Sequence, residues 1–183
     1  MANKSKTTRI LIAGFGGQGV LFMGKLLAYV GMAEDRQVSW LPSYGPEMRG
    51  GTANCSVILS DDPIGSPIVD EPDVLIAMNL PSFQKYQSAV VPGGSIVLDS
   101  SLIGEAPARK DISYYALPAT QLATDEHLDG LSNMILLGKF LEACLPTSGE
   151  LTKKALLKVV PAKKEHLLAS NEQAIALGRA YQG

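Results

Sequence analysis

Short apolar runs alternate along this chain with longer stretches of helical spacing. The run Arg9–Ala13 (RILIA) stops at a glycine and is typical of a strand buried on both faces of a parallel sheet. The next stretch, Val20–Met32, places leucines, a valine and Met23 at helical spacing and predicts a helix that closes near Gly31. Five further runs predict strands: Gln37–Leu41, Thr52–Ser60, Asp73–Ala77, Ser95–Asp99 and Asp111–Leu117.

The later part of the chain is dominated by helical patterns. Asn79, Leu80 and Pro81 read as the cap and first turn of a helix, since proline is tolerated where its missing N–H is not needed. After Leu117 we expect helices, among them Asn133–Leu145, Leu151–Val159 and Ala162–Tyr181. The alternation predicts an α/β fold, a single-domain, mostly parallel, Rossmann-like sheet flanked by helices with a helical C-terminal part.

The length of 183 residues suits one hydrophobic core, so we expect one domain over residues 1–183, with residues 1–8 flexible. In such sheets, ligands bind at the carboxyl ends of the strands. That edge is predicted to hold GFGGQG after the first strand and PSYGPEMRGG after the second. Met78-Asn79 and Ser100-Ser101 are predicted to lie beside them.

The stretch Ile12–Val20 reads IAGFGGQGV, and its glycines 14, 16 and 19 fit the spacing G-x-G-x-x-G between a strand and a helix. Two interpretations are open. Free amides around Gln18 and Gly19 could bind a phosphate or another anion, or the glycines could only let the helix pack close to the sheet. Gln18 itself either holds the neighbouring loop or contacts a ligand.

A nicotinamide site is disfavoured by the end of the second strand. An Asp or Glu about 20 residues after the glycines usually binds the adenosine ribose. Here that region reads WLPSYG, without an acid, and the next carboxylate, Glu47, lies in the following loop. An NADP site would usually have an Arg at the end of this strand to bind the 2′-phosphate, and Arg49 lies further along the chain than that position.

The loop PSYGPEMRGG, residues 42–51, is the most specific stretch of the chain. Its prolines stiffen it, its glycines permit positive φ, and it presents one acid and one base. Such a loop suits recognition of a phosphate or a partner surface, unless Glu47 and Arg49 pair with each other or with solvent. The candidate binding residues are Gly16, Gly17, Gln18, Gly19, Ser43, Tyr44, Glu47 and Arg49; no catalytic residue and no metal ligand is predicted.

Composition narrows the possible functions. Apolar residues make up 46% of the chain, charged residues 19%, and the net charge is -2, which argues against disorder and against nucleic acid as a partner. Cys55 and Cys144 are too few and too far apart for an iron–sulfur cluster, and their apolar neighbours favour inert thiols. His127 and His166 lie in polar stretches and are expected at the surface.

No apolar run approaches the length of a membrane span, and the polar, basic N-terminus contains no signal-peptide pattern. We therefore expect a cytoplasmic protein without a membrane partner.

Five motifs in order make the chain resemble the gamma subunit of the 2-oxoacid:ferredoxin oxidoreductases, above all the separate gamma chains of the 2-oxoglutarate enzymes. They are GFGGQGV (14–20), PSYGPEMRGGTANCSVILS (42–60), PDVLIAMN (72–79), NMILLG (133–138) and NEQAIALG (171–178). The first two motifs together are far more specific than the glycine spacing alone.

The resemblance implies one subunit of an enzyme that oxidatively decarboxylates a 2-oxoacid to an acyl-coenzyme A and reduces ferredoxin. It implies alpha, beta and delta subunits as partners, with thiamine diphosphate, magnesium and iron–sulfur clusters on those subunits and no cofactor on this chain alone. This chain would act in assembly and in coenzyme A binding, with the amides of Gly17 to Gly19 and the Arg49 guanidinium facing phosphates. In isolation it would expose a partner surface and could form a homodimer.

Two other classes of function remain open. The chain could be an interaction module that binds no small ligand, or a free-standing nucleotide-dependent oxidoreductase. Within the family, the gamma-like subunit of an indolepyruvate or branched-chain enzyme is a related alternative, because substrate identity is set chiefly by the other subunits.

Overall fold

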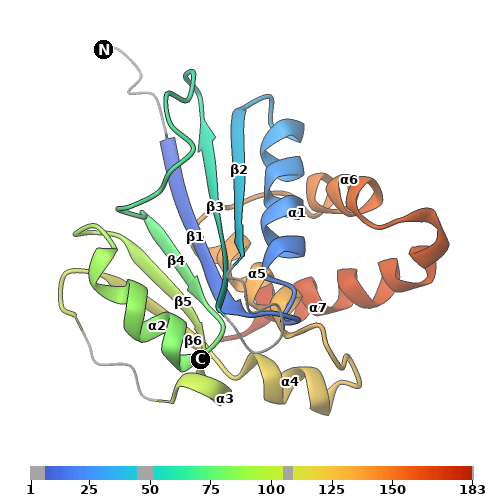
Figure 1. Ribbon diagram of the computed structural model, residues 1–183. Coiled ribbons are helices and arrows are strands. Elements are labelled where there is room, and N and C mark those ends of the chain that lie inside the picture. Colours follow the sequence, from blue (N-terminus) through green and yellow to red (C-terminus); the bar gives the residue numbers. More distant parts are fainter. Residues whose placement is uncertain (1–6, 45–51, 105–108, 183) are drawn as a thin grey trace.

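The computed structural model describes residues 7–44, 52–104 and 109–182, and its centre is a six-stranded sheet (Figure 1). The strand order is β2-β3-β1-β4-β5-β6. Five strands run in one direction, and β3 alone runs antiparallel, between β2 and β1. The bounds are β1 (Thr7–Phe15), β2 (Gln37–Tyr44), β3 (Thr52–Ser60), β4 (Val74–Ala77), β5 (Ser95–Asp99) and β6 (Ser113–Leu117).

The helices connect and cover these strands. They are α1 (Val20–Ala33), α2 (Leu80–Tyr86), η1 (Gln87–Ala89), α3 (Ser100–Ile103), α4 (Ala119–Asp125), α5 (Ser132–Ala143), α6 (Gly149–Val159), η2 (Ala162–Leu167) and α7 (Leu168–Ala180). Asn79 caps α2 by accepting a hydrogen bond from the Ser82 amide at 2.9 Å, as the sequence predicts. The predicted α/β architecture is therefore confirmed.

The sheet has a hydrophobic core on each face. On one face, α1 and α5 cover side chains such as Ile10 and Ile12 of β1, and α6 and α7 form the outer part of this layer. On the other face, α2 and α3 cover Leu11 and Leu75, with Phe83 of α2 almost fully buried. Strands buried on both faces explain the continuous apolar runs in the sequence.

The helices α5 and α7 approach each other closely because each presents a glycine to the other. A Cβ at Gly138 would collide with the backbone of Ile175, and a Cβ at Gly178 would collide with the backbone of Ile135. Only glycine fits at both positions, which explains the glycine that ends each of the motifs NMILLG and NEQAIALG.

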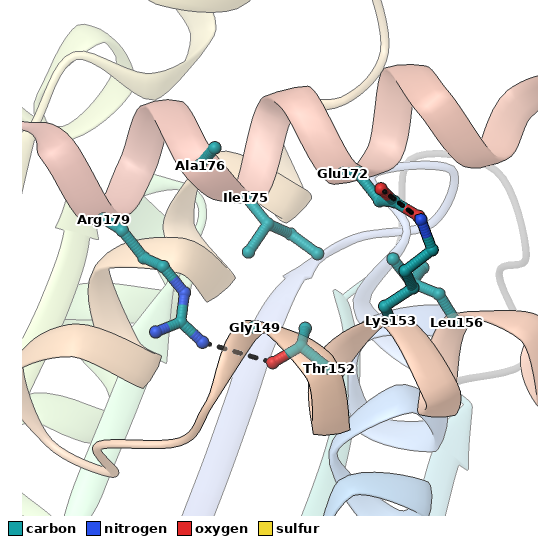
Figure 2. Close-up of a pocket in the computed structure, with 8 residues that line it drawn as sticks. All are labelled: Gly149, Thr152, Lys153, Leu156, Glu172, Ile175, Ala176 and Arg179. Carbon is teal, nitrogen blue, oxygen red and sulfur yellow. Dashed lines mark hydrogen bonds and ion pairs between the residues drawn. The ribbon is translucent and has the colours of Figure 1, made fainter.

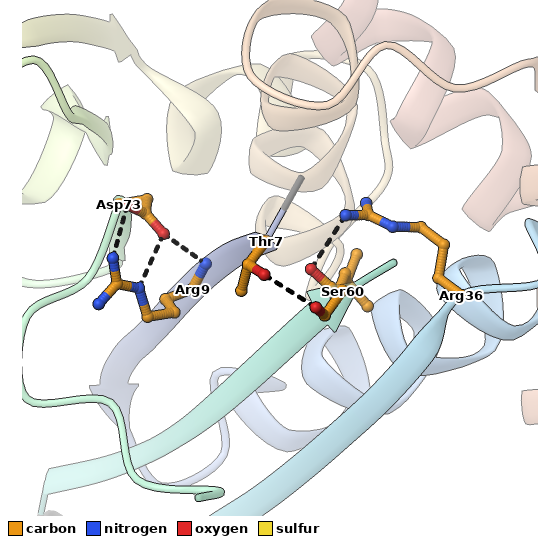
Figure 3. A network of polar contacts seen from close by, with 6 residues as sticks. Thr7, Arg9, Arg36, Ser60 and Asp73 are labelled. Carbon is orange, nitrogen blue, oxygen red and sulfur yellow. Dashed lines mark hydrogen bonds and ion pairs between the residues drawn. The ribbon is translucent and has the colours of Figure 1, made fainter. Parts of the chain in front are cut away.

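A polar network holds the amino edge of the sheet, opposite the predicted site (Figure 3). The backbone amide of Arg9 donates to Asp73 Oδ2 at 2.7 Å, and its Nε pairs with the same oxygen at 3.2 Å. The Thr7 and Ser60 hydroxyls are 2.8 Å apart, and Arg36 Nη2 donates to the Leu59 carbonyl at 2.9 Å. These contacts fix where β1, β3 and β4 begin or end.

Several predicted boundaries are corrected. Pro42, Ser43 and Tyr44 belong to β2 and pair with β3, so the loop does not begin at Pro42. Proline is tolerated there because β2 is an edge strand with one unpaired side. Thr7 and Thr8, from the segment predicted to be flexible, pair with β3, and residues 1–6 of that segment fall outside the described ranges.

The long C-terminal helix predicted over residues 162–181 is divided. The stretch η2 is a 3₁₀ helix in which Lys164 has non-helical angles, and the regular helix α7 begins only at Leu168. In the described part of the chain, no helix is both long and apolar enough to cross a membrane.

Candidate functional site

The carboxyl ends of β1, β2, β4 and β5 meet at one edge of the sheet, as predicted. Gly14 and Tyr44 both lie opposite Ala53, so β1 and β2 flank the start of β3. On the other side of β1, Ala13 lies opposite Ala77, which leads directly into Met78 and Asn79. Because neighbouring strands are about 5 Å apart, the glycine turn and the end of β2 are roughly 10 Å apart.

The turn between β1 and α1 uses glycine at positions that other residues tolerate poorly. Gly17 has φ 96° and Gly19, the N-cap of α1, has φ 77°. The space beside Gly17 is open, whereas a Cβ on Gly19 would collide with the side chain of Asn133. Gly17 is also exposed, so a ligand could approach its backbone closely.

The predicted free amide of Gln18 is not free, because it donates to the Phe15 carbonyl at 3.2 Å. In the described ranges, the amides of Gly17 and Gly19 have no hydrogen-bond acceptor. The backbone N–H groups that could donate hydrogen bonds to an anion at this turn are therefore those of Gly17 and Gly19 and those of the first residues of α1, which have no partners within the helix.

The side chain of Gln18 connects three backbone segments. Its Oε1 accepts from the Phe15 amide at 2.6 Å and from Asn79 Nδ2 at 3.2 Å, and its Nε2 donates to the Met78 carbonyl at 3.2 Å. This geometry provides the loop-holding role that was one of the two interpretations of Gln18. The amide fixes the glycine turn to the start of α2.

Asn133, at the start of α5, contacts the glycine turn, and sequence reasoning did not predict this contact. It is 4% exposed, and its Nδ2 donates to the Gly19 carbonyl at 3.3 Å. Its Oδ1 is buried and has no hydrogen-bond partner within the described part of the chain. The signal in the sequence that could have indicated this contact is a polar Asn at the start of the otherwise apolar motif NMILLG. The adjacent pocket has a volume of about 370 Å³, and its lining includes Gly19, Phe22, Lys25, Asn133, Lys164 and Asn171.

The side chains at the end of β2 alternate between the two faces of the sheet. Ser43 is exposed and lies opposite Asn54, on the face that α2 covers rather than the face that α1 covers. It lines a pocket of about 260 Å³ beside Asn54, whose Nδ2 donates to the Tyr86 hydroxyl at 3.2 Å. Tyr44 is the last residue of β2, and Glu47 and Arg49 lie outside the described residues.

The turn between β5 and α3 is held by a buried carboxylate. Asp99 is 1% exposed, and its Oδ1 accepts from the Ser101 amide at 3.0 Å. Its Oδ2 accepts from the Thr120 amide at 3.1 Å and from the Thr120 hydroxyl at 2.5 Å. Asp99 thus supplies an anion to the starts of both α3 and α4.

Cysteine and histidine show no sign of catalytic use. Burial raises the pKa of Cys55 to about 12 and that of Cys144 to about 11, so both thiols stay protonated at neutral pH. His127 and His166 are exposed, as expected. Among the residues that the structure describes, no group of His, Cys, Asp and Glu could hold a metal ion.

The sequence is similar to subunits of ketoisovalerate oxidoreductase and of 2-oxoglutarate synthase. It is 38% identical to the ketoisovalerate oxidoreductase subunit VorA of Methanothermobacter thermautotrophicus, over 93% of this chain and 35% of that protein. It is 32% identical to the 2-oxoglutarate synthase subunit KorC of Methanocaldococcus jannaschii, over 87% of this chain and 88% of that protein. The chain thus spans about a third of the length of the VorA subunits and most of the length of KorC.

Two solved structures share the fold. The gamma subunit of a keto/oxoacid ferredoxin oxidoreductase from Geobacter sulfurreducens matches with a TM-score of 0.82 at 27% identity, over 94% of both chains. The 2-oxoglutarate:ferredoxin oxidoreductase from Magnetococcus marinus, with 2-oxoglutarate, coenzyme A and succinyl-CoA bound, also matches with a TM-score of 0.82. Its identity is 26%, over 96% of this chain and 31% of that one. The profile of the pyruvate ferredoxin/flavodoxin oxidoreductase family covers residues 9–181, and the chain therefore belongs to that family.

Proposed function

We propose that this chain is the gamma subunit of a multi-subunit 2-oxoacid:ferredoxin oxidoreductase. The enzyme would decarboxylate a 2-oxoacid oxidatively, form an acyl-coenzyme A and reduce ferredoxin. The observation that carries this proposal is the similarity to KorC over nearly the whole length of both chains. The proposed partners are alpha, beta and delta subunits that supply thiamine diphosphate, magnesium and iron–sulfur clusters; two distant cysteines support placing the clusters on those subunits.

The proposed substrate is 2-oxoglutarate, with a branched-chain 2-oxoacid as the alternative. The chain covers most of the length of KorC, a 2-oxoglutarate synthase subunit, which favours 2-oxoglutarate. Its higher sequence identity to VorA, a ketoisovalerate oxidoreductase subunit, favours a branched-chain 2-oxoacid. Assembling the complex and comparing kcat/KM for 2-oxoglutarate and 2-oxoisovalerate decides between them. Both free thiols suit the reducing cytoplasm, where we place the enzyme.

Within the complex, we assign to this chain an assembly role and a part in coenzyme A binding at the carboxyl edge. Three features support a phosphate at the glycine turn: the open space beside Gly17, the acceptor-free amides of Gly17 and Gly19, and Lys25 in the adjacent pocket. The buried Oδ1 of Asn133 lacks a hydrogen-bond donor among the residues that the structure describes, as expected where a ligand or partner completes the site. Arg49 is proposed to contact a phosphate of coenzyme A.

The test is Arg49→Ala in the assembled complex, with the KM for coenzyme A and subunit association as readouts. Loss of one charge-assisted contact of about 1.4 kcal/mol should raise this KM about tenfold. Lys154→Ala, which removes an exposed cation of α6, is the control and should leave the KM unchanged. If Arg49→Ala changes neither the KM nor the association of the subunits, both roles proposed for Arg49 are wrong.

An interaction module without a small ligand is the second candidate. It is favoured by the edge strand β2, where Trp40 is 36% exposed and Leu41 is 41% exposed on opposite faces, and by the use of the Gln18 amide within the turn. Calorimetric titration of the assembled complex with coenzyme A separates the two. Binding that is insensitive to changes at Gly17 and Arg49 would favour the module.

A further inference from the structure

A groove separates α6 from α7, far along the chain from the glycine turn (Figure 2). Its volume is about 190 Å³, which corresponds to roughly six water molecules at about 30 Å³ each. Leu156 of α6 and Ile175 of α7 form its apolar floor, and Ala176 lies at its side. A molecule of about six non-hydrogen atoms fits this space.

Arg179 closes one end of the groove. Its Nη2 donates to Thr152 Oγ1 at 3.1 Å, across the gap between the two helices. Thr152 is 3% exposed, and its own hydroxyl donates to the Ser148 carbonyl at 3.0 Å. The guanidinium is therefore held in place by a neutral acceptor, and most of its five N–H donors are left for another group.

The charges in the groove are unevenly matched. At the end opposite Arg179, Lys153 and Glu172 form an ion pair at 3.3 Å, so the Lys153 charge is already compensated (Figure 2). Across residues 7–44, 52–104 and 109–182, no carboxylate lies within ion-pair distance of Arg179. Burial lowers the pKa of Arg179, an effect that the more distant Glu142 partly offsets. Arg179 is thus a half-buried cation in the groove that has no ion-pair partner among the described residues.

We propose that this groove binds a small monocarboxylic acid with a short aliphatic chain. The carboxylate pairs with the Arg179 guanidinium, whose planar fork matches two carboxylate oxygens. The aliphatic part lies on Leu156 and Ile175. A second carboxylate on the ligand would lie near Glu172, so dicarboxylic acids are disfavoured.

The geometry predicts an order of affinity. Isobutyrate should bind with a Kd of about 1 mM, the scale of weak ligands of this size. Acetate should bind less tightly because it leaves the apolar floor uncovered, and succinate because of Glu172. Inorganic phosphate should also bind weakly, since it contributes no apolar contact.

The experiment titrates the chain with isobutyrate, acetate, succinate and phosphate, and follows the backbone amide signals of Leu156 and Ile175 by NMR, because these signals are also present in variants of Arg179. Arg179→Gln should weaken isobutyrate binding at least tenfold, and Lys154→Gln, an exposed cation of α6 outside the groove, should leave it unchanged. Ala176→Trp should abolish isobutyrate binding by filling the groove, while the charge of Arg179 is kept. Because Ala176 is exposed, this substitution leaves the core intact, and the loss of binding would not result from unfolding.

Three results would overturn the proposal. The first is equal isobutyrate affinity in wild type and Arg179→Gln, and the second is equal affinity for isobutyrate and phosphate. The third is the absence of saturable isobutyrate binding to the wild type; weaker subunit assembly in Arg179→Gln would then assign Arg179 to a carboxylate side chain of a partner. None of these readouts depends on the oxidoreductase activity, so a failure of this proposal would not count against the proposed function, and the reverse also holds.

Discussion

Two turns at the carboxyl edge perform the same task with different chemistry. The turn from β5 to α3 contains the buried carboxylate of Asp99, which accepts three hydrogen bonds from Ser101 and Thr120. The turn from β1 to α1 contains no acid, and the neutral amides of Gln18 and Asn133 hold it. Each turn joins a buried strand to a helix.

The difference decides which turn is available to an external anion. Asp99 provides negative charge at the starts of α3 and α4, where the helix dipole favours it. At the start of α1 no such charge is present, and glycine amides remain without acceptors in the described ranges. An anion from outside therefore fits the glycine turn, whereas the Asp99 turn already has its own.

The largest expected effect is on stability at the Asp99 turn. Asp99→Ala removes a buried carboxylate that accepts three hydrogen bonds from Ser101 and Thr120, and at about 1.5 kcal/mol for each bond to a charged group we expect a loss of about 4 kcal/mol in the free energy of unfolding. Urea denaturation measures it. Asp99→Asn keeps one acceptor oxygen and should lose about half as much; a loss below about 1 kcal/mol for Asp99→Ala would show that the carboxylate does not hold this turn.

At the glycine turn, two alanine substitutions separate strain from collision. Gly19→Ala combines a positive φ with a collision against Asn133, and should cost about 3 kcal/mol of stability. Gly17→Ala has the same kind of φ but open space beside it, and should cost about 1 to 2 kcal/mol. Thermal or urea unfolding compares the pair, and equal losses would contradict the packing of Asn133 on Gly19.

Gln18→Glu makes the first turn resemble the second by adding an internal acid. The carboxylate can still accept from the Phe15 amide and from Asn79 but no longer donates to the Met78 carbonyl, so we expect a loss of about 1 kcal/mol. Coenzyme A affinity of the assembled complex should fall about tenfold through repulsion of the phosphates. Gln18→Met is the uncharged control; unchanged affinity in Gln18→Glu would argue against an anion at this turn.

The smallest effect concerns the Cys55 thiol beneath α1. Its folded pKa is raised to about 12 from 9.0, mainly by burial, so above pH 9 the unfolded chain releases a proton that the folded chain retains. This contribution to stability is present below pH 9 and is lost as the pH rises toward 12, by about 1 kcal/mol between pH 8 and pH 10. Urea unfolding of wild type and Cys55→Ala at both pH values measures it, and a pH-independent difference would contradict the burial effect.

The sequence predicts the elements well and their boundaries less well. Continuous apolar runs locate β1, β4 and β5 because these strands are buried on both faces. The edge strands β2 and β6 are mostly exposed or half-buried, and β-branched and aromatic residues indicate them instead. The extension of β2 through Pro42 to Tyr44 depends on its place at the edge of the sheet, which no local pattern shows. The antiparallel direction of β3 likewise follows from its pairing with β1 and β2, a tertiary property.

The candidate site is predictable in position and not in detail. The glycines and the ends of β1, β2 and β4 could be assigned to one edge because parallel strands end together. That the Gln18 amide is used within its own turn, and that Ser43 belongs to the opposite face, depends on turn geometry and strand register. Asn133 was missed because 114 residues separate it from Gly19, its hydrogen-bond partner.

The glycine contacts between α5 and α7 bear on how the outer helices of this layer are anchored. At Gly138 and Gly178 the two backbones lie so close together that a Cβ would collide, so a larger residue at either position would push α7 away from α5. The helix α6 packs mainly on α1 instead. The groove between α6 and α7 therefore separates two outer helices that are anchored to different inner helices, α1 and α5.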